Sequence, residues 1–118
     1  MAYRRSDRVS VLLLQEVVEF VRRDLKDPNL GFVTFTGVDL TDDLRHAKVY
    51  IVVRGGEEEK KRAFEILAAA AGRMRKRLGR NLKIRYAPTL TFLEDSSFDN
   101  AERIQRLLDR IHDEEKGP

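Results

Sequence analysis

The apolar residues of this chain switch repeatedly between a helical and a strand-like period, and this switching constrains the fold more than any other feature. Between residues 32 and 54, β-branched and aromatic residues alternate with polar ones, as expected for half-buried strands. The alternation is strictest at Ala47, Val49 and Ile51. On either side, apolar residues recur every three or four positions, which is typical of amphipathic helices. The sequence therefore predicts an α+β fold.

The order of the expected elements follows from these periods. Residues 7 to 26 predict a first helix that ends before Pro28. Its expected buried stripe has spacings of three and four residues: Val11, Leu14, Val18, Val21 and Leu25. Two antiparallel strands are predicted at residues 32 to 40 and 44 to 54, with a bulge at Gly37.

Residues 57 to 80 have helical periodicity, but Gly72 leaves open whether they form one helix or two. An unbroken helix would span about 36 Å and overhang a nine-residue strand of about 30 Å, and its glycine would cost about 1 kcal/mol. Four alanines before Gly72 would also allow close backbone approach. Spacing alone supports a kink at Gly72 and a continuous helix equally.

The remaining residues complete one domain. A third strand is predicted over residues 82 to 92, bent or bulged at Pro88. A last helix then carries Ala101, Ile104, Leu108 and Ile111. We expect a single domain over residues 1 to 118, ordered from about residue 7 to about residue 112, because one hydrophobic core typically serves about 100 to 200 residues.

Composition excludes several kinds of site. The chain has no cysteine, so disulfides and thiolate metal ligands are excluded, and its two histidines, His46 and His112, are far apart in sequence. The Gly55-Gly56 pair precedes three glutamates, which would repel a phosphate. We therefore expect no enzyme, no metal and no cofactor. The absence of an apolar span or signal-like segment predicts a cytoplasmic protein.

Positive charge is concentrated in one segment. The whole chain carries a net charge of only +3, yet residues 73 to 86 contain seven bases and no acid: Arg73, Arg75, Lys76, Arg77, Arg80, Lys83 and Arg85. Positions 73, 76, 77 and 80 share one face of a helix because they are three or four residues apart. Lys83 and Arg85 are expected on the polar face of the third strand. A basic patch of this kind favours a polyanion as the partner, although a solvated basic face is the simpler alternative.

Three stretches together carry a family resemblance. They are RVSVLLLQEVVEFVRRDLKDPNLGFVTFTGVDLTDDLRHAKVYI, AAAAGRMRKRLGRNLKIRYAPTLTF and EDSSFDNAERIQRLL. In this order they make the chain similar to the ribosome-binding factor A family, bacterial assembly factors of the small ribosomal subunit. No single stretch is specific, but the ordered combination covers nearly the whole chain.

The resemblance implies a type II K-homology (KH) fold, with α-β-β-α-α-β order and helices on one face of the sheet. Ordinary KH domains hold single strands with a GXXG loop between two helices. The family instead has an Ala-X-Gly interhelical kink, which Ala70, Ala71 and Gly72 match. The implied function is a monomeric, non-catalytic RNA-binding factor that docks on structured rRNA of the immature small subunit, late in its maturation. The family is also linked to 5′-end processing of this rRNA and to growth in the cold.

The predicted RNA contacts combine the charge pattern with this resemblance. Arg73, Lys76, Arg77 and Arg80 are the expected phosphate contacts, and Arg75, Lys83 and Arg85 are expected to support them. Arg4, Arg5 and Arg8 are candidates for further contacts, although a solvated terminus explains them equally well. Acidic Glu57 to Glu59 depart from a basic surface. The rival hypothesis is a protein-interaction module that binds an acidic protein through a sheet edge or an outer helix.

Overall fold

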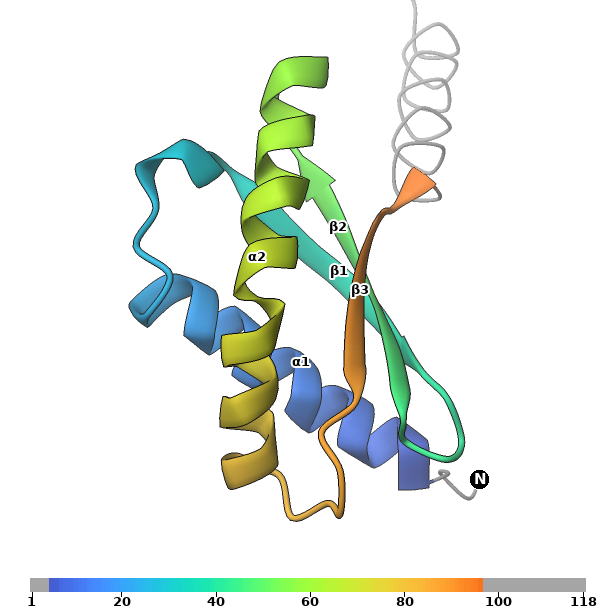
Figure 1. Ribbon diagram of the computed structural model, residues 1–118. Coiled ribbons are helices and arrows are strands. Elements are labelled where there is room, and N and C mark those ends of the chain that lie inside the picture. Colours follow the sequence, from blue (N-terminus) through green and yellow to red (C-terminus); the bar gives the residue numbers. More distant parts are fainter. Residues whose placement is uncertain (1–4, 97–118) are drawn as a thin grey trace, which may run out of the picture.

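The computed structural model describes residues 5–96, which contain two α-helices, one short 3-10 helix and three strands (Figure 1). The elements are α1 (Arg5–Arg23), the 3-10 helix η1 (Pro28–Leu30), β1 (Val33–Leu40), β2 (His46–Val53), α2 (Glu57–Asn81) and β3 (Thr89–Glu94). The predicted α+β class is confirmed. The predicted last helix and Arg4 lie outside the described residues.

The sheet has the order β1-β2-β3, so β2 is central. β1 and β2 are antiparallel, as predicted, whereas β3 runs parallel to β2. The register passes from the pair Phe35 and Ile51 directly to Gly37 and Tyr50, which leaves Thr36 as the additional residue of a bulge. The bulge therefore lies beside Gly37, and the strict alternation of β2 is matched by its burial pattern.

Both α-helices pack on the same face of the sheet (Figure 1). The predicted coverage of one face by helices is confirmed for this part of the chain. The helices and the sheet bury one continuous apolar cluster, in which Leu13, Ile51 and Leu67 are fully inaccessible. Burial of apolar side chains of this size stabilises a fold by about 1.5 to 3 kcal/mol each, before entropy is counted.

The buried stripe of α1 is one residue out of phase with the predicted stripe. Leu13, Val17 and Phe20 are buried, whereas Val11 is 58% exposed. Of the predicted stripe, Leu25 is buried just beyond the end of α1, and Leu14 and Val21 pack partly against the core. The sequence admits both phases because residues 11 to 14 are all apolar. Packing against the sheet selects the phase that places Phe20 in the core.

Helix α2 is continuous through Gly72, so the expected division into two helices does not occur. A Cβ added at Gly72 would meet no atom within 4 Å, and the residue has no left-handed backbone angle. Gly72 is exposed, whereas Ala70 is fully buried. The glycine is therefore tolerated at the helix surface, and close packing falls on Ala70. The chain returns from the far end of α2 to β3 through residues 82–88, which accommodates the length of the helix (Figure 1).

The third strand is shorter and later than predicted. It begins at Thr89, and residues 82–88 form a loop, so Lys83 and Arg85 do not lie on a strand. The loop still buries Leu82 and Pro88, and Ile84 packs partly against the core, so part of its strand-like apolar pattern reflects burial without a strand. Pro88 has no N–H group for a sheet ladder, and Arg75 donates to the carbonyl oxygen of Pro88.

Candidate nucleic-acid interface

A groove between α1 and the C-terminal half of α2 contains four of the predicted bases. We call this surface the helical groove; it has a volume of about 530 Å³ and is lined by Phe20, Asp24, Arg73, Lys76, Arg77, Arg80 and Asn81. The prediction that positions 73, 76, 77 and 80 share one face is therefore confirmed. Met74 and Leu78 lie on the buried side of the same helix.

Arg77 is committed to contacts inside the protein. Its Nε donates to Glu16 Oε2 at 3.0 Å, and its Nη1 donates to Asp24, so it connects α2 to two carboxylates of the α1 region. Its side chain is only 23% exposed. Asn81 Nδ2 donates to the same Glu16 oxygen at 2.8 Å. Arg77 was predicted as a phosphate contact, but this geometry makes it a brace that holds the two helices together.

The same contacts shift two ionisation equilibria. The hydrogen bond from Asn81 is the largest cause that lowers the pKa of Glu16 below its ordinary value. Burial opposes it, and the hydrogen bond and charge of Arg77 add to the lowering. The hydrogen bond to Glu16 raises the pKa of Arg77. Both shifts favour the charged pair at neutral pH.

The other bases of the groove remain available. Arg73 lies over the Phe20 ring, with its Cζ atom 5.6 Å from the ring centroid, a contact that orients its guanidinium. Lys76 and Arg80 are exposed, and no hydrogen bond or ion pair involves their side chains within residues 5–96. Three cations are thus presented beside a braced helix pair.

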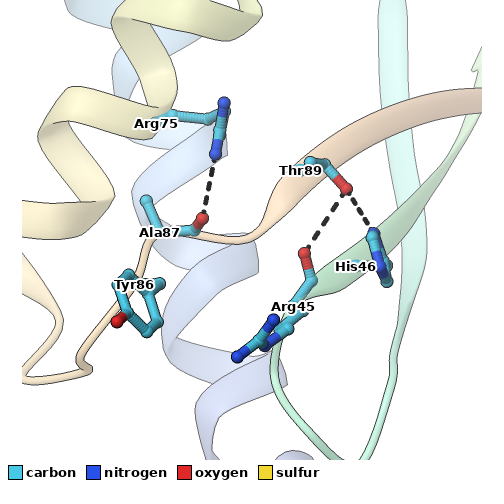
Figure 2. A pocket seen from close by; sticks show the side chains of 6 residues that line it. All are labelled: Arg45, His46, Arg75, Tyr86, Ala87 and Thr89. Carbon is cyan, nitrogen blue, oxygen red and sulfur yellow. Dashed lines mark hydrogen bonds between the residues drawn. The ribbon is translucent and has the colours of Figure 1, made fainter.

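Arg75 belongs to a different surface. With 3.6 residues per turn, it lies on the opposite side of the buried stripe of α2 from the groove bases. Its Nε donates to Pro88 O at 3.1 Å and its Nη2 to Ala87 O at 3.2 Å. It lines a smaller hollow of about 310 Å³, the Tyr86 pocket, together with Arg45, His46, Tyr86, Ala87 and Thr89 (Figure 2).

The remaining predicted bases lie near these two surfaces without joining them. Arg85 lies against Tyr86, with Cζ 5.4 Å from the ring centroid, and Lys83 is exposed on the preceding part of the loop. Arg5 and Arg8 are exposed on the first turns of α1. The seven bases of residues 73 to 86 therefore do not form one continuous patch.

Arg45 and Tyr86 were missed in the sequence. Tyr86 alternates with Leu82 and Ile84, which suggested that it faces the core, yet it is 56% exposed. The available signal was an aromatic residue next to a base, Arg85-Tyr86. Arg45 gave no signal, because its position depends on a turn in which Leu44 adopts the left-handed φ of 62°.

Two other features bear on the kind of protein. Within residues 5–96, no group of three or more histidine, cysteine or acidic side chains is placed to hold a metal ion. In the same part of the chain, no helix is long and apolar enough to cross a membrane.

The α-β-β-α-β order, with both helices on one face of a three-stranded sheet, defines an α+β domain of the KH-like class. The family model of ribosome-binding factor A matches residues 5–108. The ribosome-binding factor A of Desulforamulus reducens is 42% identical over 97% of this chain and 95% of its own length. The chain belongs to the ribosome-binding factor A family.

Solved structures agree with this assignment. The crystal structure of ribosome-binding factor A from Thermus thermophilus superposes with a TM-score of 0.65 at 28% identity, covering 75% of this chain and 94% of that chain. A homology model of the Thermus thermophilus protein, fitted into a cryo-electron microscopy map of its 30S complex, gives a TM-score of 0.59 at 30% identity. It covers 71% of this chain and 88% of that one.

Proposed function

We propose that this protein is a non-catalytic RNA-binding assembly factor that binds the immature small ribosomal subunit and supports its late maturation. The proposal also includes a more specific role, in 5′-end processing of the small-subunit rRNA and in growth in the cold. We also infer that the protein acts in the cytoplasm as a monomer when free. The single observation that carries the proposal is the helical groove, where Arg73, Lys76 and Arg80 form no ion pair with residues 5–96 and stand on a braced pair of helices.

The chemistry of the groove supports RNA rather than a small substrate. Arg73, Lys76 and Arg80 present point charges and fork-shaped donors suited to backbone phosphates. Among the described residues, Asp24 is the one acid that lines the groove. Arg77 engages its carboxylate, so it opposes an anion less than a free carboxylate would. The Thermus thermophilus relative forms a complex with the 30S particle, and a partner of that kind is the one proposed for the groove.

Salt dependence tests the proposal directly. Binding of the full chain to purified immature small subunits should weaken steeply as salt rises, with a log-log slope of about 0.7 to 0.9 per phosphate contacted. Lys76→Ala combined with Arg80→Ala should reduce this slope by about one unit per base removed.

The matched control is Lys61→Ala combined with Arg62→Ala. These bases are exposed on α2 as well, but near its N-terminal end and outside the groove. The control should bind with the wild-type slope. Equal losses in both variants would show that only net charge matters, and unchanged binding in the groove variant would remove this surface from the function. Binding to acidic proteins without binding to subunits would favour the interaction module.

The role in rRNA processing and in growth in the cold can be tested in cells. A strain that lacks this protein should accumulate small subunits with an unprocessed 5′ rRNA end, more strongly in the cold. Complementation with the wild type and with the control pair should restore processing, whereas the groove pair should not. Normal rRNA ends in the deletion strain at low temperature would contradict the processing role while leaving subunit binding untouched.

A further inference from the structure

The Tyr86 pocket combines an exposed aromatic ring with convergent cations. Tyr86 is 56% exposed and lies on the loop between α2 and β3. The Cζ atoms of Arg45 and Arg85 lie 5.6 and 5.4 Å from its ring centroid. Such cation–π contacts orient the ring without burying it. An exposed aromatic residue beside arginines is the arrangement that proteins use to stack unpaired bases.

The walls of the pocket are fixed before any ligand arrives. Arg75 holds the loop by donating hydrogen bonds to the carbonyl oxygens of Ala87 and Pro88. Figure 2 shows the hydrogen bond to Ala87. The Thr89 hydroxyl lies 2.8 Å from His46 Nδ1 and donates weakly to Arg45 O at 3.4 Å. These bonds tie the start of β3 to the start of β2. Preorganisation of this kind lowers the cost of ordering a ligand.

The turn that carries Arg45 is also held in place. Asp43 Oδ1 accepts from the Thr41 hydroxyl at 2.6 Å and from Arg45 N at 3.0 Å. Leu44 has a left-handed φ of 62°, which a leucine adopts only when its surroundings require it, and its side chain is buried in the core. Arg45 thus leaves a rigid turn toward Tyr86.

Size and charge select the ligand class. A volume of about 310 Å³ is at the lower end of the range of about 300 to 1,000 Å³ for small-molecule sites, which suits one nucleotide better than a larger ligand. No acid lines the pocket within the described part of the chain. A second hollow of about 190 Å³ shares Arg45 and Tyr86 and adds Arg5 and Arg85, so cations continue past the ring. One acid, Asp43, also lines this second hollow, and its carboxylate accepts hydrogen bonds from Thr41 and from Arg45 N. A continuous strand can use both hollows, whereas a free mononucleotide uses one.

We propose that the Tyr86 pocket is a second RNA contact that holds one unpaired nucleotide of a strand. The base stacks on one face of the Tyr86 ring in place of an arginine guanidinium, and Arg45 contacts the adjacent phosphate. Arg75 holds the loop through Ala87 and Pro88. This inference rests on the proposed function, because it assumes that the partner is RNA. It adds that the protein reads a single-stranded element on the side of α2 away from the helical groove.

The test measures binding of a short uridine oligomer and of an RNA duplex to the full chain. Tyr86→Leu should lower affinity for the oligomer by about 5- to 140-fold, the range expected for loss of one stacked base. Tyr86→Phe should stay near wild type, because it keeps the ring. Phe32→Leu is the matched control, since Phe32 is 80% exposed and remote from the pocket in the sequence. Duplex affinity should be the same in all four proteins.

A positional measurement accompanies the affinities. A 4-thiouridine oligomer should cross-link to residues 82–89 of the wild type, and Arg45→Gln should reduce this cross-link while thermal unfolding stays unchanged. Equal oligomer affinity in Tyr86→Leu, or cross-links elsewhere, would overturn the inference. Equally tight binding of uridine monophosphate would make the site a mononucleotide pocket and overturn it too.

Subunit binding, measured in parallel by sedimentation, separates the two proposals. If wild type binds immature subunits but Tyr86→Leu binds the oligomer normally, the pocket inference fails and the proposed function stands. If the oligomer binds at Tyr86 but wild type does not bind subunits, the proposed function fails instead.

Discussion

The helical groove and the Tyr86 pocket draw on the same basic segment but differ in what surrounds each base. The groove lies between two helices, and its cations share one face of α2. One of them, Arg77, forms ion pairs that hold the helices together. The pocket is formed by the turn that leads into β2, by Arg75 of α2 and by the loop that leads into β3. Arg45 and Arg85 lie against its aromatic ring, Tyr86. The first arrangement suits phosphates of structured RNA, and the second suits an unpaired base. The kind of ligand that a basic residue can bind therefore depends on the residues that surround it in the fold.

The largest expected effect separates the two surfaces. Lys76→Glu combined with Arg80→Glu replaces attraction with repulsion in the groove, so affinity for immature subunits should fall by about 100-fold or more. Affinity for the short uridine oligomer should fall much less, because the Tyr86 pocket keeps its bases. Both are measured by filter binding at one fixed salt concentration.

Lys61→Glu combined with Arg62→Glu carries the same charge change and is the control. A similar loss of oligomer affinity in the groove variant and the control would mean that long-range charge governs both surfaces. A loss of oligomer affinity in the groove variant alone, as large as the loss for subunits, would merge groove and pocket into one site.

The second prediction affects both surfaces through the helix that they share. Ala70 is fully buried where α2 packs on the core, so Ala70→Leu should overpack this contact and lower the free energy of unfolding by about 1 to 3 kcal/mol. Chemical denaturation measures this change. Ala69→Leu is the control, because Ala69 is exposed on the same helix and should be close to neutral. Equal stability of the two variants would show that α2 does not pack closely at Ala70.

The fold could be predicted from the sequence in segments whose apolar pattern allows a single arrangement, and could not where the pattern allows two. The strict alternation of β2 allows only one face of the strand to be buried, and Ala47, Val49 and Ile51, where the alternation is strictest, are all buried. The run of four apolar residues in α1 admits two helical phases, and only the shape of the sheet decides between them. In the loop of residues 82–88, Leu82 is buried and Ile84 partly buried, but Tyr86 continues their alternation while being exposed, and no ladder forms there.

The candidate sites show the same limit. Helical spacing was enough to place Arg73, Lys76 and Arg80 on one face. It could not reveal that Arg77 would meet Glu16, a residue 61 positions away in the sequence. Long-range contacts of this kind depend on the packing angle of two helices, which no local pattern records. Helical spacing also separates Arg75 from this face, but its hydrogen bonds to Ala87 O and Pro88 O depend on the path of the loop, which no local pattern records.

A smaller effect tests the glycine that was expected to bend α2. Gly72→Ala should raise the free energy of unfolding by about 0.5 to 1 kcal/mol, because the added methyl meets no atom within 4 Å and alanine favours helix. Gly79→Ala is the matched variant, since its methyl would make only an ordinary contact with Ala87 Cβ at 3.9 Å. Both should bind subunits normally. Loss of subunit binding in Gly72→Ala, but not in Gly79→Ala, would support the hypothesis of a functional kink at Gly72.

The smallest expected effect is the pH dependence of the brace in the groove. Because Asn81 and Arg77 lower the pKa of Glu16 in the folded protein, the unfolded chain takes up the proton first as pH falls. The contribution of Glu16 to stability is therefore fully present well above its ordinary pKa of 4.5 and is lost as pH falls through the lower folded value. The difference in unfolding midpoint between wild type and Glu16→Gln should be constant near neutral pH and shrink steadily below about pH 4.5, which urea titrations across pH measure. Glu65→Gln is the control, an exposed carboxylate of α2 outside the groove. A difference that persists unchanged at the lowest pH would show that Glu16 acts through packing and not through its charge, and the groove would then lack the ionic brace that distinguishes it from the Tyr86 pocket.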